Sequence, residues 1–262
     1  MSDAAAGADV VVVTGAGRGI GRAIALRFAR SGARLVLAAR SVAELQETQT
    51  MAADLGSEAV VVPTDVTDQA QTERMAQAAL TEFGALDVLV CNSGVAGPTA
   101  PLWEIEPEQW RHTHAVNVEG VYLCCRAALP VMLERGSGSV IVIGSMTGKR
   151  ALHGRTPYAA SKTALIGLVR TLAWEVGEFG IRVNLVSPGA VDGPRIEGVI
   201  AAQAQALAIT EQQAHERFTS ASPLGRLTEA DDVAETVRFL ASRAAAGITG
   251  EDVNVSVGAV MY

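Results

Sequence analysis

The chain is poor in lysine, although it is not poor in positive charge. Only Lys149 and Lys162 are lysines among the 21 basic residues of its 262, and the other 19 are arginines. With 28 acidic residues the formal net charge is -7, so the sequence lacks the basic footprint on which binding to a phosphate backbone depends. We therefore expect no nucleic-acid partner.

Aromatic side chains are also scarce. They make up 4% of the residues, whereas 49% are hydrophobic, so the core has to be built from alanine, valine, leucine and isoleucine. A chain of this length and apolar content can bury a complete core, and its aliphatic residues exclude a disordered protein.

Cysteines are few and long apolar runs are missing. Cys91, Cys124 and Cys125 have no C-x-x-C spacing, which is typical of free thiols in a reducing cytoplasm. Residues 1–9 show no secretory signal, and no apolar run approaches the roughly 18 residues that span a bilayer. These absences predict a cytoplasmic protein without a membrane partner.

Short apolar runs alternate with helical patterns along the chain. The first run, Val10–Val13, is continuous and β-branched, which is typical of a strand buried on both faces of a parallel sheet. Such alternation implies right-handed crossovers and predicts the α/β class: one doubly wound domain over residues 1–262, a seven-stranded parallel sheet with helices on both faces. Strands are predicted at 10–13, 35–38, 60–62, 88–91, 140–143, 183–186 and 253–257, and helices up to about Gly32 and over 42–55, 69–83, 107–134 and 158–178.

Residues 192–222 fit this alternation least well. They hold Gly193, Pro194 and a helical piece rich in alanine and glutamine, and Pro223 follows. An insertion after the carboxyl end of a strand is where α/β folds place segments that cover a ligand. A surface helical hairpin is the alternative, and the position favours a lid.

A glycine-rich turn follows the first predicted strand. Glycines permit positive φ angles and the close approach of a pyrophosphate, and the next helix offers amide donors at its N-terminus. The spacing is T-G-x-x-x-G-x-G and not the generic G-x-G-x-x-G. Its position after the first strand favours dinucleotide binding over a purely structural turn. The residues predicted to bind the cofactor here are Thr14, Gly15, Gly17, Arg18, Gly19, Ile20 and Gly21.

Charge indicates which dinucleotide is bound. NAD sites usually have an acidic residue about 20 positions after the glycines, where it accepts a ribose hydroxyl. Here no acidic residue occurs between Asp9 and Glu44, and the second strand ends in Arg40 and Ser41. Arg40, helped by Arg18, suits a ribose 2′-phosphate, although two solvated arginines are the alternative. The sequence therefore favours NADP(H), with NAD(H) as the alternative cofactor.

Tyr158 and Lys162 stand four residues apart at the start of a predicted helix, so they share one helix face. A free tyrosine has a pKa of about 10, and lowering it by about 3 units requires roughly 4 kcal/mol of differential stabilisation from a neighbouring cation. Such a tyrosine suits proton transfer in carbonyl–alcohol chemistry. The pair alone is also common on solvated helix faces, so the hypothesis needs further residues.

Two polar residues are candidates for the same site. Ser145 follows the predicted strand 140–143 and so lies at the carboxyl edge of the sheet, where its hydroxyl can hold a substrate oxygen. Asn117 lies inside the predicted helix 107–134, where asparagine is a poor helix former, and this conflict suits a site role. A surface position is the alternative for Asn117.

Other chemistries fit poorly. His112 and His114 are two residues apart on a predicted helix and face different directions, so no metal site is predicted. Ser145 does not stand in the G-x-S-x-G elbow of a serine hydrolase.

Taken in order, these motifs resemble those of the short-chain dehydrogenase/reductase family over essentially the whole chain. Besides the glycine turn and the four residues Asn117, Ser145, Tyr158 and Lys162, the resemblance rests on Asp65-Val66, Asn92-Ser93-Gly94 and Pro188-Gly189. It implies a Rossmann-type fold and an NAD(P)-dependent oxidoreductase that acts on a small-molecule ketone or secondary alcohol.

The resemblance also implies a role for each residue. Tyr158 is the proton donor and acceptor, and Lys162 lowers its pKa and binds the nicotinamide ribose. Ser145 positions the carbonyl, and Asn117 supports a water in a proton relay. Cofactor contacts are expected from Arg40, Ser41, Asp65, Val66, Asn92, Ser93, Gly94, Tyr158, Lys162, Pro188, Gly189 and Val191.

Two positions depart from the family pattern. Ser93 replaces the usual alanine, which is a small polar change. Gly193 replaces the threonine that often follows Pro-Gly-x-Val-x, which removes or shifts one hydrogen bond to the nicotinamide carboxamide.

The resemblance further implies a homotetramer whose interfaces use the helices 107–134 and 158–178. Substrate determinants are expected in residues 95–103, 146–155 and the lid, where Arg150, Arg155 and Arg195 suit an anionic substrate. A dinucleotide-binding regulator without turnover is the alternative from another class. It would be expected to have lost one of the four catalytic positions, and all four are filled.

Overall fold

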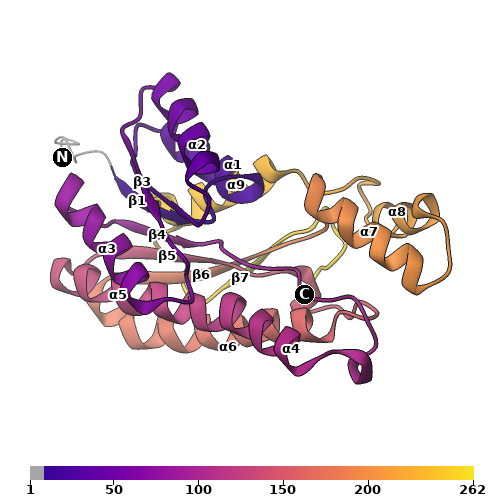
Figure 1. Ribbon diagram of the computed structural model, residues 1–262. Helices are drawn as coiled ribbons and strands as arrows, with labels where there is room; N and C mark the ends of the chain where they lie inside the picture. Colours follow the sequence, from indigo (N-terminus) through magenta and orange to yellow (C-terminus); the bar gives the residue numbers. More distant parts are fainter. Residues whose placement is uncertain (1–8) are drawn as a thin grey trace.

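The structure, a computed structural model, describes residues 9–262. At its centre lies a parallel sheet of seven strands in the order β3-β2-β1-β4-β5-β6-β7 (Figure 1). The predicted α/β class and the seven-stranded doubly wound sheet are confirmed, whereas the expected lack of a secretory signal falls mostly outside the described residues. The strands are β1 Val10–Thr14, β2 Arg34–Ala39, β3 Ala59–Pro63, β4 Val88–Cys91, β5 Gly138–Ile143, β6 Ile181–Pro188 and β7 Asp252–Val255.

Helices cover both faces of the sheet. Apolar side chains of α1, α2 and α9 pack on one face, and those of α3, α5 and α6 pack on the other (Figure 1). The helices are α1 Gly19–Ala29, α2 Val42–Asp54, α3 Gln69–Phe83, α4 Pro107–His114, α5 Gly120–Arg135, α6 Thr156–Val176, α7 Pro194–Ala206, α8 Glu211–Ser220 and α9 Ala230–Ala241.

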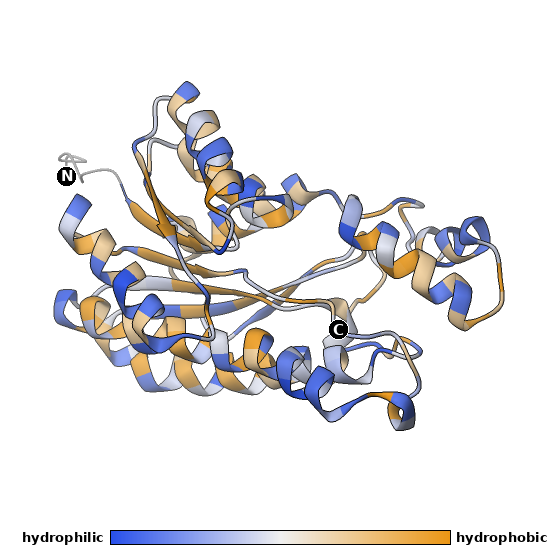
Figure 2. Ribbon diagram, viewed as in Figure 1, coloured by the Kyte–Doolittle hydropathy of each residue, from blue (hydrophilic) through white to orange (hydrophobic). Residues whose placement is uncertain are grey.

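The strand β1 shows why the apolar run is continuous. Successive side chains of a strand point to opposite faces, so Val10 and Val12 join one core cluster while Val11 and Val13 join the other. All four are fully buried. Figure 2 shows the result, apolar strands between helices whose outer sides are polar.

The predicted helix 107–134 is helical throughout but is not one α-helix. A π-turn over Ala115–Glu119 separates α4 from α5. By length and composition Pro107–Arg135 could cross a membrane, yet half of its most apolar window is buried inside this fold. Residues of α5 such as Cys124 and Ala128 belong to the core, as expected for a core helix of a globular domain.

Other elements and boundaries also differ from the sequence analysis. The helix α9 was not predicted, although a capping box of Glu229 and Asp232 precedes its buried residues. The helix α6 begins at Thr156, since Pro157 occupies its first turn, and it gives way to a 3₁₀ turn over Gly177–Phe179. The strand β7 ends at Val255.

The predicted insertion 192–222 consists of two helices, α7 and α8, that extend beyond the ends of the strands (Figure 1). They share a small apolar cluster of Ile196, Ile200, Ala204 and Ala214. In the segment between α8 and α9, Arg226 forms ion pairs with Asp232 at 2.8 Å and with Glu229 at 3.7 Å. The insertion is therefore a helical hairpin in shape, and this shape is compatible with a lid.

The glycine turn after β1 leaves no room for a side chain at Gly21. A Cβ there would overlap the carbonyl oxygen of Gly15, and Gly15 has a φ of 66°, in the left-handed region that favours glycine. Both groups are backbone, so neither can move aside without moving the turn.

We expect Gly21→Ala to lower the free energy of unfolding by about 2–4 kcal/mol, because the added methyl group has to displace the turn. Gly198, on α7, is the matched control, since no atom lies within 4 Å of the position of its missing Cβ. Gly198→Ala should raise stability by about 0.5–1 kcal/mol. Urea unfolding followed by circular dichroism measures both, and equal effects of the two changes would contradict the clash.

Candidate active site and dinucleotide site

The candidate site lies along the carboxyl edge of the sheet, where the strand order reverses. β1 and β4 are neighbours, while the chain continues from β1 toward β2 on one side and from β4 toward β5 on the other. Such a switch point is where doubly wound sheets bind ligands. The glycine turn, Asn92-Ser93-Gly94, Ser145 and Pro188-Gly189 all lie at the carboxyl ends of strands, as predicted.

Thr14 and Asn92 tie the ends of β1 and β4 together. The Thr14 hydroxyl accepts the amides of Asn92 at 2.9 Å and Ser93 at 3.0 Å. In return the Asn92 side chain donates to the carbonyl oxygens of Thr14 at 2.9 Å and Gly15 at 3.3 Å. These two predicted cofactor residues therefore shape the turn that would hold the cofactor.

The N-terminus of α1 is open to an anion. Arg18 occupies the cap position without a side-chain cap bond, and the first turn of the helix has no acidic residue. The first amides of a helix lack partners within it and attract phosphate groups. These features fit the pyrophosphate of a dinucleotide.

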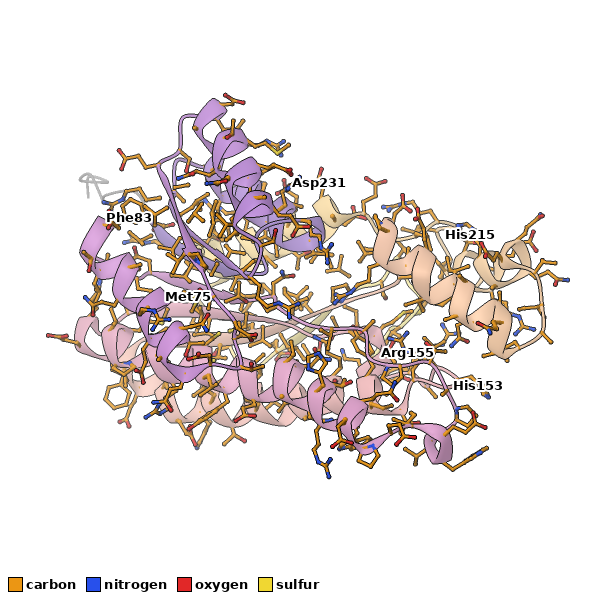
Figure 3. The ribbon with its side chains drawn as sticks, viewed as in Figure 1. Met75, Phe83, His153, Arg155, His215 and Asp231 are labelled. Atoms are coloured by element: carbon orange, nitrogen blue, oxygen red, sulfur yellow. The ribbon has the colours of Figure 1, made fainter. Side chains whose placement is uncertain are left out.

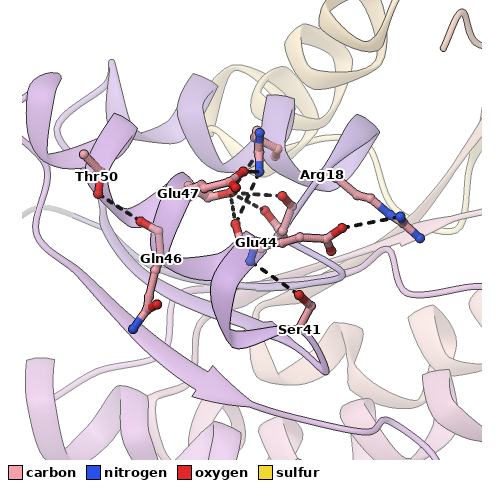
Figure 4. Close-up of polar contacts among 10 residues, drawn as sticks. Arg18, Ser41, Glu44, Gln46, Glu47 and Thr50 are labelled. Atoms are coloured by element: carbon pink, nitrogen blue, oxygen red, sulfur yellow. Dashed lines mark hydrogen bonds and ion pairs between the residues drawn. The ribbon is translucent and has the colours of Figure 1, made fainter. Parts of the chain in front are cut away.

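Arg18, which the sequence analysis places beside Arg40 at a ribose phosphate, has an acidic partner in the structure. Arg18 pairs with Glu44 of α2 at 3.4 Å, and the Ser41 hydroxyl accepts the Glu44 amide at 3.4 Å as the N-cap of α2 (Figure 4). Arg40 is exposed at the end of the strand. Arg40 is thus better placed than Arg18 to receive an additional anion.

Asp65 and Val66 follow β3 near this position. The carboxylate of Asp65 accepts the amide and the hydroxyl of Thr67, at 3.0 Å and 2.8 Å. The pKa of Asp65 is lowered, most of all by the hydrogen bond from the backbone amide of Thr67. Burial acts in the opposite direction, and the positive charge of Arg40 adds to the lowering. Val66 is buried, and a Cβ on Gly120 would lie 2.7 Å from its methyl group, so it also fixes the start of α5.

Tyr158 and Lys162 lie on α6 and face the end of β5. Lys162 is 5% exposed, and its ammonium donates to the carbonyl oxygen of Ile143 at 2.8 Å. Its nitrogen lies 5.8 Å from the centre of the Tyr158 ring. Ser145 is buried, and its hydroxyl accepts the amide of Thr147 at 3.1 Å; it also lowers the pKa of the Tyr158 phenol.

The surroundings favour the ionised form of Tyr158. Burial raises the pKa of the phenol, but Lys162, Arg195, Ser145 and Arg155 together lower it below its ordinary value. Burial lowers the pKa of Lys162, and Tyr158 opposes that shift. The surroundings therefore shift the pKa of Tyr158 from that of a free phenol toward neutral pH.

Asn117 sits in the π-turn and is fully buried, so the surface alternative is wrong. Its side chain accepts the Val95 amide at 2.8 Å and donates to the Val95 carbonyl and the Ser161 hydroxyl, each at 3.0 Å. The Ser161 hydroxyl donates to the carbonyl of Tyr158 at 2.8 Å. Asn117 thus links the segment after β4 to the turn of α6 that carries the tyrosine.

The segment after β6 is held by β7. The Gly189 amide donates to Val255 at 2.8 Å, and a Cβ on Gly189 would lie 2.8 Å from the Thr228 hydroxyl. Val191 pairs with Thr228 in an isolated parallel bridge. Gly193 has a φ of 128°, so the position of the family threonine has a backbone that favours glycine.

A cavity of about 260 Å³ lies between residues 146–153, the helices α7 and α8 of the predicted lid, and residues 256–259. Its walls are mostly apolar, with Met146 and Thr147 next to Ser145 on one side. Two of the expected substrate segments line it, but residues 95–103 do not, and residues 256–259 were not expected. The exposed Arg195 of α7 donates to the carbonyl of Gly94 across the edge of the sheet.

A phenol of lowered pKa beside a buried ammonium, at the switch point of a dinucleotide-type sheet, defines a nicotinamide-dependent oxidoreductase. The residues present fit the cofactor, because the amides of α1 and the hydrogens of the Lys162 ammonium that Ile143 does not accept remain available.

Known proteins agree with this class. A family profile described as Enoyl-(Acyl carrier protein) reductase matches residues 15–259. The chain is 38% identical over 250 residues to cis-4-hydroxycyclohexanecarboxylate dehydrogenase of Sinomonas cyclohexanicum, which covers 95% of each chain. A variant of actinorhodin polyketide ketoreductase with NADPH aligns with a TM-score of 0.93 and 33% identity, over 97% of this chain and 98% of that one. NAD⁺-bound xylitol dehydrogenase aligns with a TM-score of 0.93 and 26% identity, over 95% of this chain and 98% of that one.

The chain belongs to the short-chain dehydrogenase/reductase family. It is an NAD(P)-dependent oxidoreductase that acts on a ketone or an alcohol.

The lowered pKa of Tyr158 can be measured directly, because the chain has only three tyrosines. We expect one tyrosine to ionise below the ordinary pKa of about 10, seen as phenolate absorbance that rises at lower pH than for the other two. The early step should vanish in Tyr158→Phe and move to higher pH in Lys162→Met, since removal of the cation destabilises the phenolate. A titration curve that Tyr158→Phe leaves unchanged would contradict the lowered pKa.

Proposed function

We propose that the protein transfers a hydride between NADP(H) and a ketone or secondary alcohol, with Tyr158 as the general acid and base. The observation that carries the proposal is the group formed by Tyr158, Lys162 and Ser145, in which a cation and a hydroxyl both favour the phenolate. The bound nicotinamide supplies or accepts the hydride.

The side chains of the chain have separate tasks in this mechanism. The Ser145 hydroxyl binds and orients the substrate oxygen, and the Tyr158 phenol gives a proton to that oxygen in reduction or takes one from it in oxidation. The Lys162 ammonium, fixed by the Ile143 carbonyl, stabilises the phenolate between these events and binds the nicotinamide ribose. Because both Asn117 amide hydrogens are donated to Val95 and Ser161, a relay water would approach Asn117 at an acceptor oxygen.

The proposed preference for NADP(H) rests on the end of β2. The strand ends without a carboxylate for a ribose hydroxyl, and the exposed Arg40 follows it. Glu44 is the nearest acidic residue downstream in the chain, and Arg18 is paired with it. NADPH is present in the related ketoreductase and NAD⁺ in the related xylitol dehydrogenase, so NAD(H) is the alternative.

We expect Tyr158→Phe to lower kcat for ketone reduction by about 1,000-fold or more, because no other group replaces the proton donor. Binding of NADPH, measured by fluorescence titration, should change little, since the aromatic ring remains. The substrate panel should contain linear ketones, cyclic ketones and diketones, and acyl thioester analogues. Retained turnover in this variant would refute the proposed mechanism.

A separate variant tests the cofactor. We expect Arg40→Ala to raise KM for NADPH by about 10–100-fold while KM for NADH changes by less than about threefold, because only NADPH carries the phosphate. Arg30→Ala, at the exposed end of α1, is a matched control for the loss of one arginine. A wild-type enzyme that already prefers NADH would refute this part of the proposal and leave the mechanism intact.

We also propose a cytoplasmic homotetramer. The cytoplasm suits the three cysteines, which are free and buried. Two large apolar side chains on the expected interface helices are exposed, Trp174 at 90% on α6 and Tyr122 at 51% on α5, and an interface would cover them. Light scattering of the purified protein tests the assembly.

A further inference from the structure

Arg155 is a buried cation that has no acidic partner in the part of the chain that the structure describes. Its side chain is 3% exposed, and none of the ion pairs within residues 9–262 includes it. One terminal nitrogen donates to the carbonyl of Ala96 at 2.6 Å and the other to the hydroxyl of Thr99 at 3.3 Å. Its Nε has no hydrogen-bond partner at all. Of five donor hydrogens, the guanidinium thus uses two, both on neutral acceptors.

Two other cations that this fold largely withdraws from water, Lys149 and Arg182, are compensated. Lys149 forms an ion pair with Asp252 at 2.9 Å. Arg182 donates to four carbonyl groups, among them Leu240 at 2.6 Å and Ala241 at 3.1 Å at the end of α9, where the helix dipole is negative. A buried cation usually requires such a partner, so the surroundings of Arg155 are incomplete without an anion.

The position of Arg155 indicates where that anion belongs. It precedes α6, three residues before Tyr158, and its guanidinium carbon lies 5.0 Å from the centre of the Tyr158 ring. The charged groups that influence Tyr158 are Lys162, Arg195 and Arg155, all of them cations. Figure 3 shows Arg155 on the side of the molecule that carries the lid helices. The guanidinium therefore lies beside the tyrosine that would meet the substrate oxygen.

We propose that Arg155 binds a carboxylate of the substrate, so that the substrate class of this enzyme is the oxo acids and hydroxy acids. The inference rests on the proposed function, because the carboxylate and the carbonyl that meets Tyr158 belong to one molecule. A guanidinium matches a carboxylate in two parallel hydrogen bonds, and such bonds to a buried cation are strong. Since Arg155 packs against the ring of Tyr158, the two groups of the substrate are only a few bonds apart.

A second role for Arg155 has to be distinguished from this one. The same cation lies over the face of the Tyr158 ring and favours the phenolate. Its effect on the pKa of Tyr158 is smaller than those of Lys162, Arg195 and Ser145. Loss of that influence would slow every substrate equally and move the pH midpoint of turnover upward. Loss of an anchor affects only substrates that carry a carboxylate.

The experiment compares acids with their neutral esters. The substrates are acetoacetate, 4-oxopentanoate and 5-oxohexanoate, each beside its methyl ester, with NADPH. The variants are Arg155→Gln, which removes the charge, Arg155→Lys, which keeps it, and Arg74→Gln as the control on the exposed face of α3. Calorimetry with NADP⁺ in place of NADPH measures binding of the oxo acids without turnover.

We expect the wild-type enzyme to prefer at least one acid over its ester by about tenfold or more. Arg155→Gln should lower kcat/KM for that acid by about 100-fold, mostly through KM, and this loss should exceed the loss for the ester by about tenfold or more. Arg155→Lys should restore part of the acid preference, while Arg74→Gln and the dissociation constant of NADPH stay unchanged. In calorimetry, binding of the acid should be lost in Arg155→Gln.

Three results would overturn the inference. The first is a wild-type enzyme that reduces esters as well as acids. The second is an equal loss on acids and esters in Arg155→Gln with an upward shift of the pH midpoint, which would assign Arg155 to the tyrosine. The third is the absence of oxo acid binding in calorimetry. If wild-type enzyme turns over no ketone, the proposed function fails, and calorimetry still decides whether Arg155 binds the carboxylate. If Arg155→Gln does not fold, the acid preference of Arg155→Lys decides.

Discussion

The hydrogen bond from the Lys162 ammonium to the Ile143 carbonyl is the interaction on which the rest of the site depends. Burial of an ion costs several kcal/mol, so a lysine that is 5% exposed stays charged only where acceptors surround it. The carbonyl at the end of β5 is one acceptor, and the phenolate of Tyr158 is the other charge that faces it. Tyr158 lies one turn before Lys162 on the same face of α6, so the packing that brings Lys162 to the end of β5 also brings Tyr158 to Ser145.

Helices and strands were predictable from the sequence where the pattern of apolar residues agrees with the capping residues or turns at the ends of the element. The strand β4 and the helix α3 have the bounds that the sequence predicts, because β4 is a short apolar run and α3 has Asp68 as N-cap and Gly84 as left-handed end. The helix α9 was not predicted, although its capping box of Glu229 and Asp232 is visible in the sequence. The right-handed crossovers restrict the possible strand orders but do not determine the observed one.

Features that depend on distant contacts were not predictable. Asn117 signals a conflict inside a helix, but the π-turn that resolves it depends on the Val95 backbone. Arg155 is one arginine among 19 in the sequence, and only the packing of residues 96–99 makes it a buried cation. Likewise Arg18 has no visible partner until α2 folds back and presents Glu44. In each case a polar group is defined by a neighbour more than 20 residues away.

Gly193 is the point at which the chain leaves the sheet and enters the helical hairpin α7–α8. At a φ of 128°, the residue before α7 has a backbone that a β-branched side chain adopts only under strain, so the chain leaves the sheet there in a direction that the threonine of relatives does not readily permit. A segment that replaces the hairpin α7–α8 therefore has to include Gly193, because the backbone at this glycine sets the direction in which α7 leaves the sheet.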